Sequence, residues 1–518
     1  MKDKPLFSAA VAVTAATILV RLFGFFREVA LAGFYGAGSV SDAFIIAFTI
    51  PGIVLALVSS SVSSAFIPLY TRVEDNKSFT RNIVSCLTLL GLIFSVVFTI
   101  FPQALVFLFA SQLDEETFKI AVALTRLMAW AAIPVLLVEI LRSYLQLQKV
   151  FFIALIVNIP INIMTIAAIA VSKPIGNPVL MSAGTVLGNI ICLGLLFFAA
   201  KKHGWVYRPY LDLRMPELRK MLILLAPVFI STAIIELQQI IDRNFASSLP
   251  SGSVSAMNYS VKVISMISGL IGLSVATVLY PHMSKLSAEN GNESLTRYLS
   301  GSIKKLTPLL LPITVGFIVL AEPFVRIVFE RGSFTAADTR LTSECLRMYA
   351  LLCLPASIGP VLIRGFYAMR NTKTPALISV FSVVIGVALN FLLIGPLKHQ
   401  GLALATSIAS LVSMFLLIIF LKNKLKLLGL RSWFAELGKT VIATAVMGCA
   451  LWCAYKLLPV MSGGVVRCII FTAAVAAASA VLYGLMLRIL RSEFIIYGIY
   501  QLKVFLKRKS AMNEPDET

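Results

Sequence analysis

The chain is divided by charged and Gly- or Pro-containing breaks into fourteen long apolar runs. A helix that crosses a bilayer needs about 20 mainly apolar residues, whereas barrel strands are short alternating segments. The runs therefore predict an all-α polytopic membrane protein with 14 transmembrane helices. Their approximate cores are residues 6–26, 43–70, 83–110, 119–141, 150–172, 179–200, 221–241, 257–281, 306–328, 346–368, 376–397, 400–421, 438–458 and 465–487.

Composition excludes most other classes of protein. Of the 518 residues, 58% are hydrophobic and 13% are charged, against about 45–50% apolar and about 25% charged in soluble chains. Too little polar surface remains for a soluble enzyme, a secreted disulfide scaffold or a disordered chain. The seven cysteines and three histidines show no spacing typical of a metal site or a nucleophile. We therefore predict that the protein is not an enzyme, with no catalytic residue and no bound metal cluster.

The excess of positive charge predicts orientation. The chain has 45 Lys and Arg against 24 Asp and Glu, a net charge of +21. No basic stretch has the interleaved aromatics of a base-stacking surface, so nucleic acid is not a predicted partner. The basic residues instead gather on alternate loops and at both ends of the chain. Under the positive-inside rule, both termini are predicted to be cytoplasmic.

An internal repeat predicts the domain organisation. Gly38-Ser39-Val40-Ser41 recurs as Gly252-Ser253-Val254-Ser255, and each copy precedes an apolar helix that ends at a proline, Pro68 or Pro281. Six helices separate the copies, so the repeats are parallel, an arrangement typical of transporters with alternating access. The predicted domains are an N-lobe of helices 1–6 (1–202), a C-lobe of helices 7–12 (203–430), two extra helices 13 and 14 (431–490), and a basic cytoplasmic tail (491–518).

Charged residues inside the apolar runs mark a candidate site. A central Arg or Lys costs roughly 2.5–3.5 kcal/mol on insertion scales, so such residues normally face a water-filled cavity. Arg21 and Arg27 are about 120° apart on an ideal helix, so we expect a helix break at Gly24 to let both face one cavity. Lys262 adds a third cation, and we expect Asp42 to hold an arginine while the site is empty. The candidate substrate-binding residues are therefore Arg21, Gly24, Arg27, Asp42 and Lys262.

The chemistry of these residues predicts an anionic substrate. An arginine fork binds phosphate through two hydrogen bonds, and a lysine acts as a point charge. The chain contains no GxxxxGK[ST] nucleotide-binding motif. Transport is therefore predicted to be driven by the substrate, an ion gradient or the membrane potential.

Several sequence blocks, taken in order, resemble the MurJ (MviN) lipid II flippase family of the multidrug/oligosaccharidyl-lipid/polysaccharide exporter superfamily. The likeness covers nearly the whole chain. The blocks are Arg21-Leu-Phe-Gly24-Phe-Phe-Arg27-Glu, Gly36-Ala-Gly38, Asp42-Ala-Phe44, Ser64-Ala-Phe66-Ile-Pro68, Phe329-Glu-Arg331-Gly332-Ser-Phe334, Arg364-Gly-Phe366-Tyr367-Ala368, Asn371-Thr372-Lys373-Thr374-Pro375 and Gly401-Leu-Ala-Leu-Ala405-Thr406-Ser407.

The resemblance implies two lobes that form a V around a cationic cavity. It implies that the substrate is lipid II, undecaprenyl pyrophosphate carrying a disaccharide-pentapeptide, moved from the cytoplasmic to the outer leaflet. Helices 13 and 14 would form a groove for the lipid tail. Arg21, Arg27 and Asp42 match family positions, and Lys262 stands where the family has an arginine. After Pro51 the chain lacks the charged residues usual in the family.

The resemblance also implies a coupling ion but no cofactor. Some family members resemble sodium-coupled carriers, and Asp242, Asn390 and Thr406 fall near the corresponding positions, with Ile394 in place of a second acid. Coupling to Na⁺ or to the membrane potential is therefore expected. The implied location is the bacterial cytoplasmic (inner) membrane, and the implied partners are lipid II, the phospholipid bilayer and cell-wall synthesis proteins.

Three other functions remain open from the sequence. A flippase for another polyprenyl-pyrophosphate-linked oligosaccharide would need the same cations. A cation-coupled drug exporter would need an acidic cavity, and the predicted cavity is basic. A scaffold for cell-wall synthesis would have no use for buried arginines, which are costly in a membrane.

Overall fold

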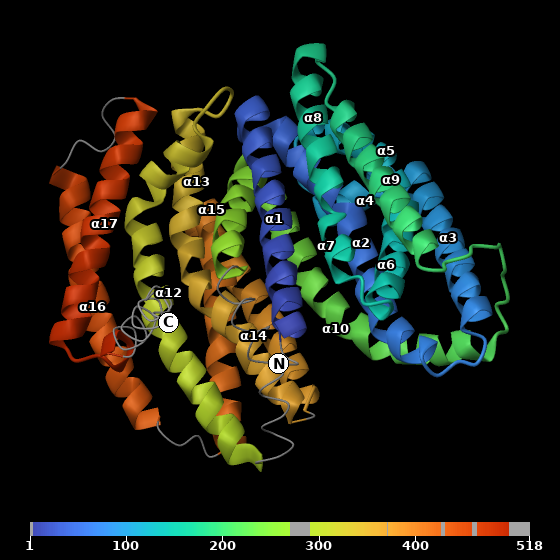
Figure 1. Cartoon of the computed structure of the whole chain (residues 1–518). Coiled ribbons are helices and arrows are strands. Elements are labelled where there is room, and N and C mark those ends of the chain that lie inside the picture. The colour runs from blue at the N-terminus through green and yellow to red at the C-terminus, as the bar shows by residue number, and fades with distance from the viewer. Residues whose placement is uncertain (1–3, 270–290, 370, 426–429, 458–463, 497–518) are drawn as a thin grey trace, which may run out of the picture. The chain divides into compact units, whose positions relative to one another are not determined.

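The computed structural model describes residues 4–269, 291–369, 371–425, 430–457 and 464–496. Within these ranges the ordered elements are all helices (Figure 1), which confirms the predicted all-α class. Ten helices of the described part are long and apolar enough to cross a membrane. The number is eleven if the bent pair Pro216–Ile230 and Thr232–Ser247 is one span.

The helices form two compact units. The first comprises Met1–Met266, Phe329–Cys345 and Val383–Ala405, and the second comprises Ile267–Val328, Leu346–Ser382 and Thr406–Thr518. The first unit contains α1 (Lys4–Tyr35), α2 (Ser39–Tyr70), α3 (Asn76–Ile100), α4 (Pro102–Phe109), α5 (Glu115–Met128), η1 (Ala129–Ala131), α6 (Ala132–Leu147), α7 (Phe151–Ile156), α8 (Ile159–Ile175), α9 (Val179–Lys202), α10 (Pro216–Ser247) and helical residues 253–266.

The second unit holds most of the remaining helices. Three labelled helices contribute residues to both units: α13 (Ala336–Tyr349), α15 (Lys373–Leu425) and, through Phe329 alone, α12 (Gly291–Phe329). In the second unit, α16 packs beside α17 (Figure 1). The helices of this unit are α12 (Gly291–Phe329), η2 (Ala350–Leu352), α14 (Cys353–Ala368), α16 (Leu430–Leu457) and α17 (Val465–Ile489).

The long helix α15 shows how the predicted spans appear in the structure. Its apolar part, Lys373–Lys422, has 50 residues, which as a straight helix would be about 75 Å long, against about 30 Å for a hydrocarbon core. The helix is broken at Lys398 (φ 47°, ψ −128°), between the predicted runs 376–397 and 400–421. Three other predictions reach beyond the described residues: the run 257–281 past residue 269, the run 438–458 past residue 457, and the tail 491–518 past residue 496.

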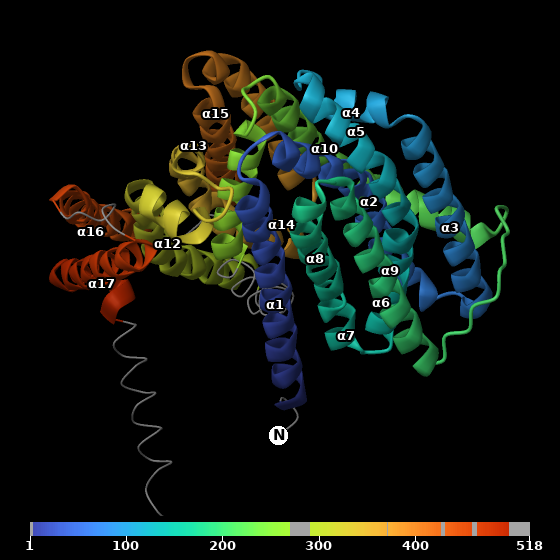
Figure 2. The same cartoon turned by 90° about the horizontal axis from the view of Figure 1, so that it is seen from above.

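The pair α8 and α9 is held by small residues. Gly184 and Gly188 lie four apart on α9, and a Cβ added to Gly188 would lie 2.7 Å from the Cα of Ile161 on α8. Such close backbone contact is typical of the small-xxx-small interfaces of membrane helices. The two helices run side by side in both views (Figures 1 and 2). Because Asn162 follows Ile161 and Asn189 follows Gly188, this contact brings the two asparagines to neighbouring positions.

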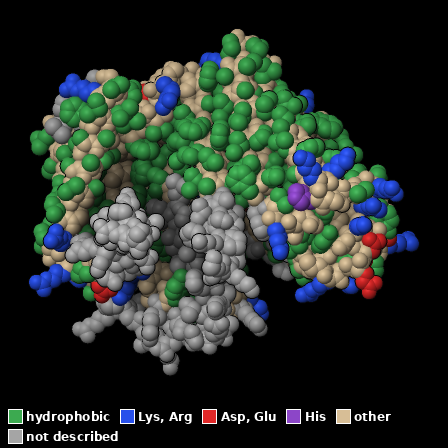
Figure 3. All heavy atoms as spheres, in the orientation of Figure 1, with side chains coloured by type: hydrophobic (Ala, Val, Ile, Leu, Met, Phe, Trp, Pro, Cys, Tyr) green, Lys and Arg blue, Asp and Glu red, His purple; other side chains and the backbone are tan. Residues whose placement is uncertain are grey.

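The outer surface of the first unit is strongly apolar. Four large hydrophobic side chains of α8 and α9 are between 46% and 59% exposed: Ile163, Leu187, Ile190 and Phe198. Figure 3 shows hydrophobic side chains covering most of the described surface on this face. Exposed apolar area on this scale suits a hydrocarbon environment, where backbone polar groups are satisfied within each helix.

Candidate functional site

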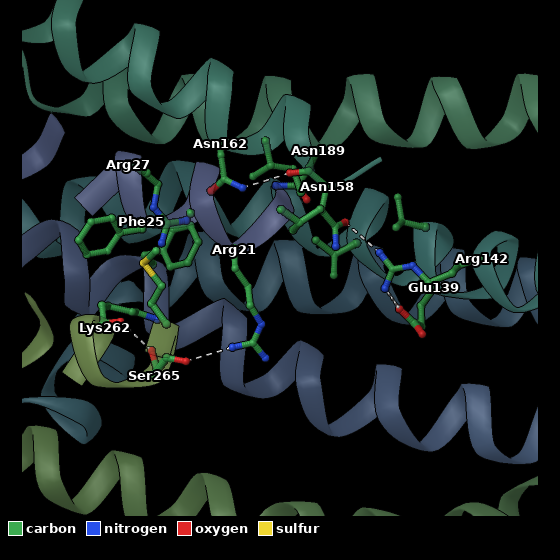
Figure 4. Close-up of a pocket in the computed structure, with 17 residues that line it drawn as sticks. Arg21, Phe25, Arg27, Glu139, Arg142, Asn158, Asn162, Asn189, Lys262 and Ser265 are labelled. Atoms are coloured by element: carbon green, nitrogen blue, oxygen red, sulfur yellow. Dashed lines mark hydrogen bonds and ion pairs between the residues drawn. The ribbon is translucent and has the colours of Figure 1, made fainter. Parts of the chain in front are cut away.

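A cavity of about 500 Å³ lies within the first unit and is shown in Figure 4. We call it the cationic pocket because the described residues that line it include four cations, Arg21, Arg27, Arg142 and Lys262, but a single carboxylate, that of Glu139. Its walls come from α1, α2, α6, α8, α9 and the helical segment 253–269. Of the predicted site residues, Arg21, Gly24, Arg27 and Lys262 line this cavity, and Asp42 does not.

Helix α1 reaches this arrangement without the expected break. It is continuous from Lys4 to Tyr35, so the prediction of a break at Gly24 is wrong. On an ideal helix Gly24 points midway between Arg21 and Arg27, about 60° from each. Because Gly24 has no side chain, the two long guanidinium arms reach around it into the same space.

Arg27 is buried and fixed by its neighbours. Its side chain is bonded through Nη2 to Glu28 Oε1 (2.7 Å), and its guanidinium lies 4.2 Å from the centre of the Phe48 ring. Glu28 Oε2 in turn accepts a hydrogen bond from Asn258 Nδ2 (3.0 Å). Arg27 Nε is buried without a hydrogen-bond partner in the described structure. Glu28 was not a predicted site residue, although its position next to Arg27 was a signal.

Within the described part of the chain, most hydrogen-bond donors of Arg21 and Lys262 have no partner. Arg21 Nη1 donates one hydrogen bond, to the carbonyl oxygen of Ser265 (3.2 Å). Ser265 Oγ donates to the carbonyl oxygen of Lys262 (3.0 Å), which leaves the lysine ammonium out of this network. Open donors from one arginine and one lysine on a cavity wall suit a phosphate-bearing ligand.

The other end of the pocket is polar but charge-balanced. Arg142 Nη1 donates to Glu139 Oε2 (2.9 Å), and Nη2 donates to Asn158 Oδ1 (2.8 Å). Asn162 and Asn189 complete this wall (Figure 4). A search for charges in apolar runs misses the three asparagines because they are neutral. The i, i+4 spacing of Asn158 and Asn162 in an apolar run was the available signal.

Asp42 forms a separate buried cluster, the Asp42 cap, with Gly252 and Ser255. Its carboxylate accepts hydrogen bonds from the backbone N–H groups of Gly252 and Ser255 (both 2.7 Å) and from the Ser255 hydroxyl. The expectation that Asp42 holds an arginine is therefore wrong, because backbone and hydroxyl donors occupy the carboxylate. The cap joins the two copies of the internal repeat and places a negative charge at the N-terminus of helix 253–269, where the helix dipole stabilises it.

The Asp42 cap depends on glycines in left-handed conformations. Gly36 has φ +68° and Gly252 has φ +92°. A Cβ on Gly36 would lie 2.7 Å from Ser333 O, and one on Gly252 would collide with Ala37 O. Side chains at these positions would therefore separate the α1–α2 turn from the segments packed on it.

Two of the three candidate sodium ligands contact each other. Asn390 Nδ2 donates to Asp242 Oδ1 (2.7 Å), and Asn390 Oδ1 is buried without a hydrogen-bond partner in the described part of the chain. A carboxylate beside an unused amide oxygen fits a hard cation such as Na⁺, which prefers oxygen ligands. Thr406 belongs to the second unit.

Comparison with known proteins identifies the family. Residues 31–493 match the family model described as "Lipid II flippase MurJ". The chain belongs to the MurJ family. It is 29% identical over 435 residues to a probable lipid II flippase MurJ of Rickettsia prowazekii, covering 82% of this chain and 85% of the relative. It is 26% identical to the lipid II flippase MurJ of Burkholderia cenocepacia, covering 87% of this chain and 90% of the relative.

Solved structures agree with the MurJ assignment at the level of the fold. A lipid II flippase MurJ in an inward closed conformation superposes with a TM-score of 0.78 at 24% identity, covering 93% of this chain and 99% of that one. An inward-facing MATE-family multidrug transporter of the MOP superfamily gives a TM-score of 0.67 at 14% identity, covering 80% and 98%. The MurJ-family chain therefore has the fold of these two solved structures.

Proposed function

We propose that this MurJ-family protein is a lipid II flippase that moves the lipid-linked peptidoglycan precursor from the cytoplasmic to the outer leaflet by alternating access. The observation that carries the proposal is the cationic pocket, in which Arg21 and Lys262 present open donors beside the fixed guanidinium of Arg27. A pyrophosphate is the part of lipid II that needs such donors. Charge-assisted hydrogen bonds contribute about 1.5–3 kcal/mol each.

The three cations have different parts in the proposed binding. Arg27 is held by Glu28 and Phe48, so it provides a preorganised positive surface. Arg21 has one hydrogen bond to the protein and can turn its fork to the phosphate oxygens. Lys262 supplies a point charge, which tolerates changes in phosphate orientation. Fixed and mobile donors together allow the headgroup to be bound and then released.

The flipping assay is the direct test. The purified protein is reconstituted in liposomes with lipid II, and transfer between leaflets is followed with and without protein. We expect transfer well above that of protein-free liposomes, and much slower transfer in Arg21→Gln. A wild-type rate equal to that of protein-free liposomes would overturn the proposal.

The proposed topology is 14 transmembrane helices with both termini cytoplasmic. It has two six-helix lobes (1–202 and 203–430), a lipid-tail groove formed by helices 13 and 14 (431–490), and a cytoplasmic tail (491–518). The break at Lys398 supports separate helices 11 and 12. Exposed apolar side chains on α16 and α17, such as Trp452 and Ile470, support contact with lipid. Cell-wall synthesis proteins as partners remain a prediction.

Cysteine labelling tests this topology. In a background without the exposed Cys449 and Cys453, a cysteine at Lys202 or Lys304 should react only from the cytoplasmic side. A cysteine at Glu115 should react only from outside, as should one at Lys398. Opposite labelling at any of these positions would contradict the helix count.

We further propose that Na⁺ drives the cycle through Asp242 and Asn390. Thr406 as a third ligand stays a prediction from the sequence. The unused Asn390 oxygen beside the Asp242 carboxylate supports this. Asp242→Asn keeps the shape but removes the charge, so transport by this variant should no longer respond to a Na⁺ gradient. If the transport rate of the wild-type protein is the same with and without Na⁺, coupling to this ion is refuted and coupling to the membrane potential is favoured.

A further inference from the structure

The cationic pocket has a second half in which the charges are already used by the protein. Arg142 donates three hydrogen bonds, to Glu139 Oε2 (2.9 Å), Asn158 Oδ1 (2.8 Å) and the carbonyl oxygen of Ala154 (3.0 Å). Arg21, at the opposite end, donates one. Arg142 is therefore a positioning residue that holds Asn158, and a phosphate would have to break existing bonds to reach its guanidinium.

Three asparagines form the wall of this half, which we call the amide wall: Asn158, Asn162 and Asn189. Asn162 is 7% exposed and Asn189 is 5% exposed, and all three line the pocket. Amides buried in a membrane helix are costly unless they make hydrogen bonds. The hydrogen bonds that these asparagines make leave some of their polar atoms without a partner among the described residues.

The atoms left over are mainly acceptors. Asn162 Nδ2 donates to the carbonyl oxygen of Asn158 (3.2 Å), and Asn189 Nδ2 donates to the carbonyl oxygen of Thr185 (2.9 Å). Neither Oδ1 receives a hydrogen bond from the described residues. In Asn158 the amide oxygen is used and the amide nitrogen is not: Oδ1 accepts a hydrogen bond from Arg142, and the NH₂ group has no acceptor among the described residues. The amide wall therefore offers two acceptors and one donor group to a ligand.

This pattern excludes a second phosphate subsite. A phosphate at neutral pH presents acceptor oxygens, which the Asn162 and Asn189 oxygens would repel. Hydroxyl groups can donate to those oxygens, and an acetamido carbonyl can accept from the Asn158 NH₂ group. The complementary ligand is neutral and carries both hydroxyl and amide groups, as an N-acetylated sugar does.

The amide wall lies directly beside the cations. A Cβ placed on Gly24 would lie 3.9 Å from Asn162 Oδ1, and Gly24 lies between Arg21 and Arg27 on α1. Figure 4 shows the asparagines between Arg27 and the Arg142–Glu139 pair. A group that binds here must therefore be attached close to the phosphate.

We infer that Asn158, Asn162 and Asn189 bind the sugar attached to the pyrophosphate, so that the pocket reads the headgroup in a fixed direction, with phosphate at Arg21 and Lys262 and sugar at the amide wall. This inference rests on the proposed function and names the specificity determinants of that same site. It makes the pocket selective for a glycosylated polyprenyl pyrophosphate over the bare one.

The test compares two lipids on matched variants. Binding of lipid II and of undecaprenyl pyrophosphate, which lacks the sugar, is measured to purified protein in nanodiscs. Asn162→Leu and Asn189→Leu remove the hydrogen bonds at similar volume, and Asn162→Ala covers the case in which leucine does not fit. Thr165→Val is the control, because Thr165 is a fully buried polar residue of α8 outside the pocket lining. Thermal unfolding confirms that each variant is folded.

We expect each asparagine variant to weaken lipid II binding on the order of tenfold, the size of one lost hydrogen bond of about 1.4 kcal/mol. Binding of undecaprenyl pyrophosphate should not change, while Arg21→Gln should weaken both lipids. Equal losses for both lipids, or no loss for lipid II, would overturn the sugar subsite while leaving the flippase proposal intact. A wild-type protein that binds neither lipid would instead refute the proposed function, and the sugar subsite with it.

Discussion

The carboxylate of Asp42 and the guanidinium of Arg21 lie in the same compact unit, but they differ in how many hydrogen bonds the surrounding protein makes to them. Asp42 is 3% exposed and accepts hydrogen bonds from two backbone N–H groups and one hydroxyl. Arg21 faces a cavity and donates one hydrogen bond, to Ser265. In the Asp42 cap the hydrogen bonds of the buried charge are thus made within the protein, whereas the cationic pocket has donors without a partner among the described residues.

The difference separates structural from functional buried charge. A buried ion is tolerated when its hydrogen bonds are made by the protein, and removing one partner then destabilises the fold. A charge with open donors contributes little to stability and is retained at the cost of inserting it in the membrane. Substitutions in the Asp42 cap should therefore affect stability first, and substitutions of Arg21 should affect transport first.

The largest effect is expected from Asp42→Ala. Two buried N–H groups and one hydroxyl lose their acceptor, and each unsatisfied group costs about 1–3 kcal/mol. We expect a destabilisation of about 3 kcal/mol or more, measured by thermal unfolding in detergent. Asp75→Ala is the matched control, because Asp75 caps α3 at the surface through Ser78 N, so its loss should destabilise the protein much less. Equal destabilisation by the two changes would remove the special status of the Asp42 cap.

Arg21→Gln should show the opposite behaviour. The loss of one hydrogen bond to Ser265 should change unfolding little, while the loss of a charge-assisted phosphate contact of about 1.5–3 kcal/mol should slow flipping roughly 10- to 100-fold. Arg21→Lys should be intermediate because lysine has no fork. Lys119→Gln serves as a control, since Lys119 pairs with Glu115 on the exposed surface. An Arg21→Gln protein that unfolds much earlier yet flips normally would reverse the comparison.

The sequence predicted which charged residues lie together better than it predicted how they are arranged. Insertion costs alone singled out Arg21, Arg27 and Lys262, and the structure brings them together. The predicted break at Gly24 is wrong because the length of an arginine side chain, and not only its direction from the helix axis, decides which space it reaches. An arginine reaches far enough to turn around a glycine on a straight helix.

The partners of Asp42 could not be predicted by pairing charges. They are backbone N–H groups of the second repeat copy, which carry no sequence signal other than the repeat itself. The three asparagines of the amide wall were not predicted for a similar reason, since neutral amides inside apolar runs cannot be distinguished from packing residues by their charge. The break of α15 at Lys398 was predictable, because hydrophobic length alone requires two spans.

Lys262→Gln tests how far the pocket extends along helix 253–269. The change keeps a polar side chain but removes the charge, so flipping should fall roughly tenfold if Lys262 shares the pyrophosphate with Arg21, as one lost contact of about 1.4 kcal/mol implies. Lys262→Arg should remain active, and Lys262→Glu should be inactive because it repels phosphate. Normal transport by Lys262→Gln would show that the ammonium only extends to solvent, and the cations that bind phosphate would then be restricted to those of α1.

The smallest effect is expected from Gly24→Ala, at the position where the cations meet the amide wall. An alanine Cβ would lie 3.9 Å from Asn162 Oδ1, an ordinary contact, and alanine favours a helix by about 0.5–1 kcal/mol over glycine. Gly24→Ala should therefore raise the unfolding temperature slightly and reduce flipping only a few-fold. Gly24→Leu would fill the space into which both arginines turn, so it should keep the fold and stop transport. The two variants distinguish two reasons for a glycine here, the space that it leaves and the backbone conformation that it allows. If Gly24→Ala lowers stability, the glycine is needed for the helix backbone. If Gly24→Leu transports normally, the space in front of α1 is not part of the substrate path.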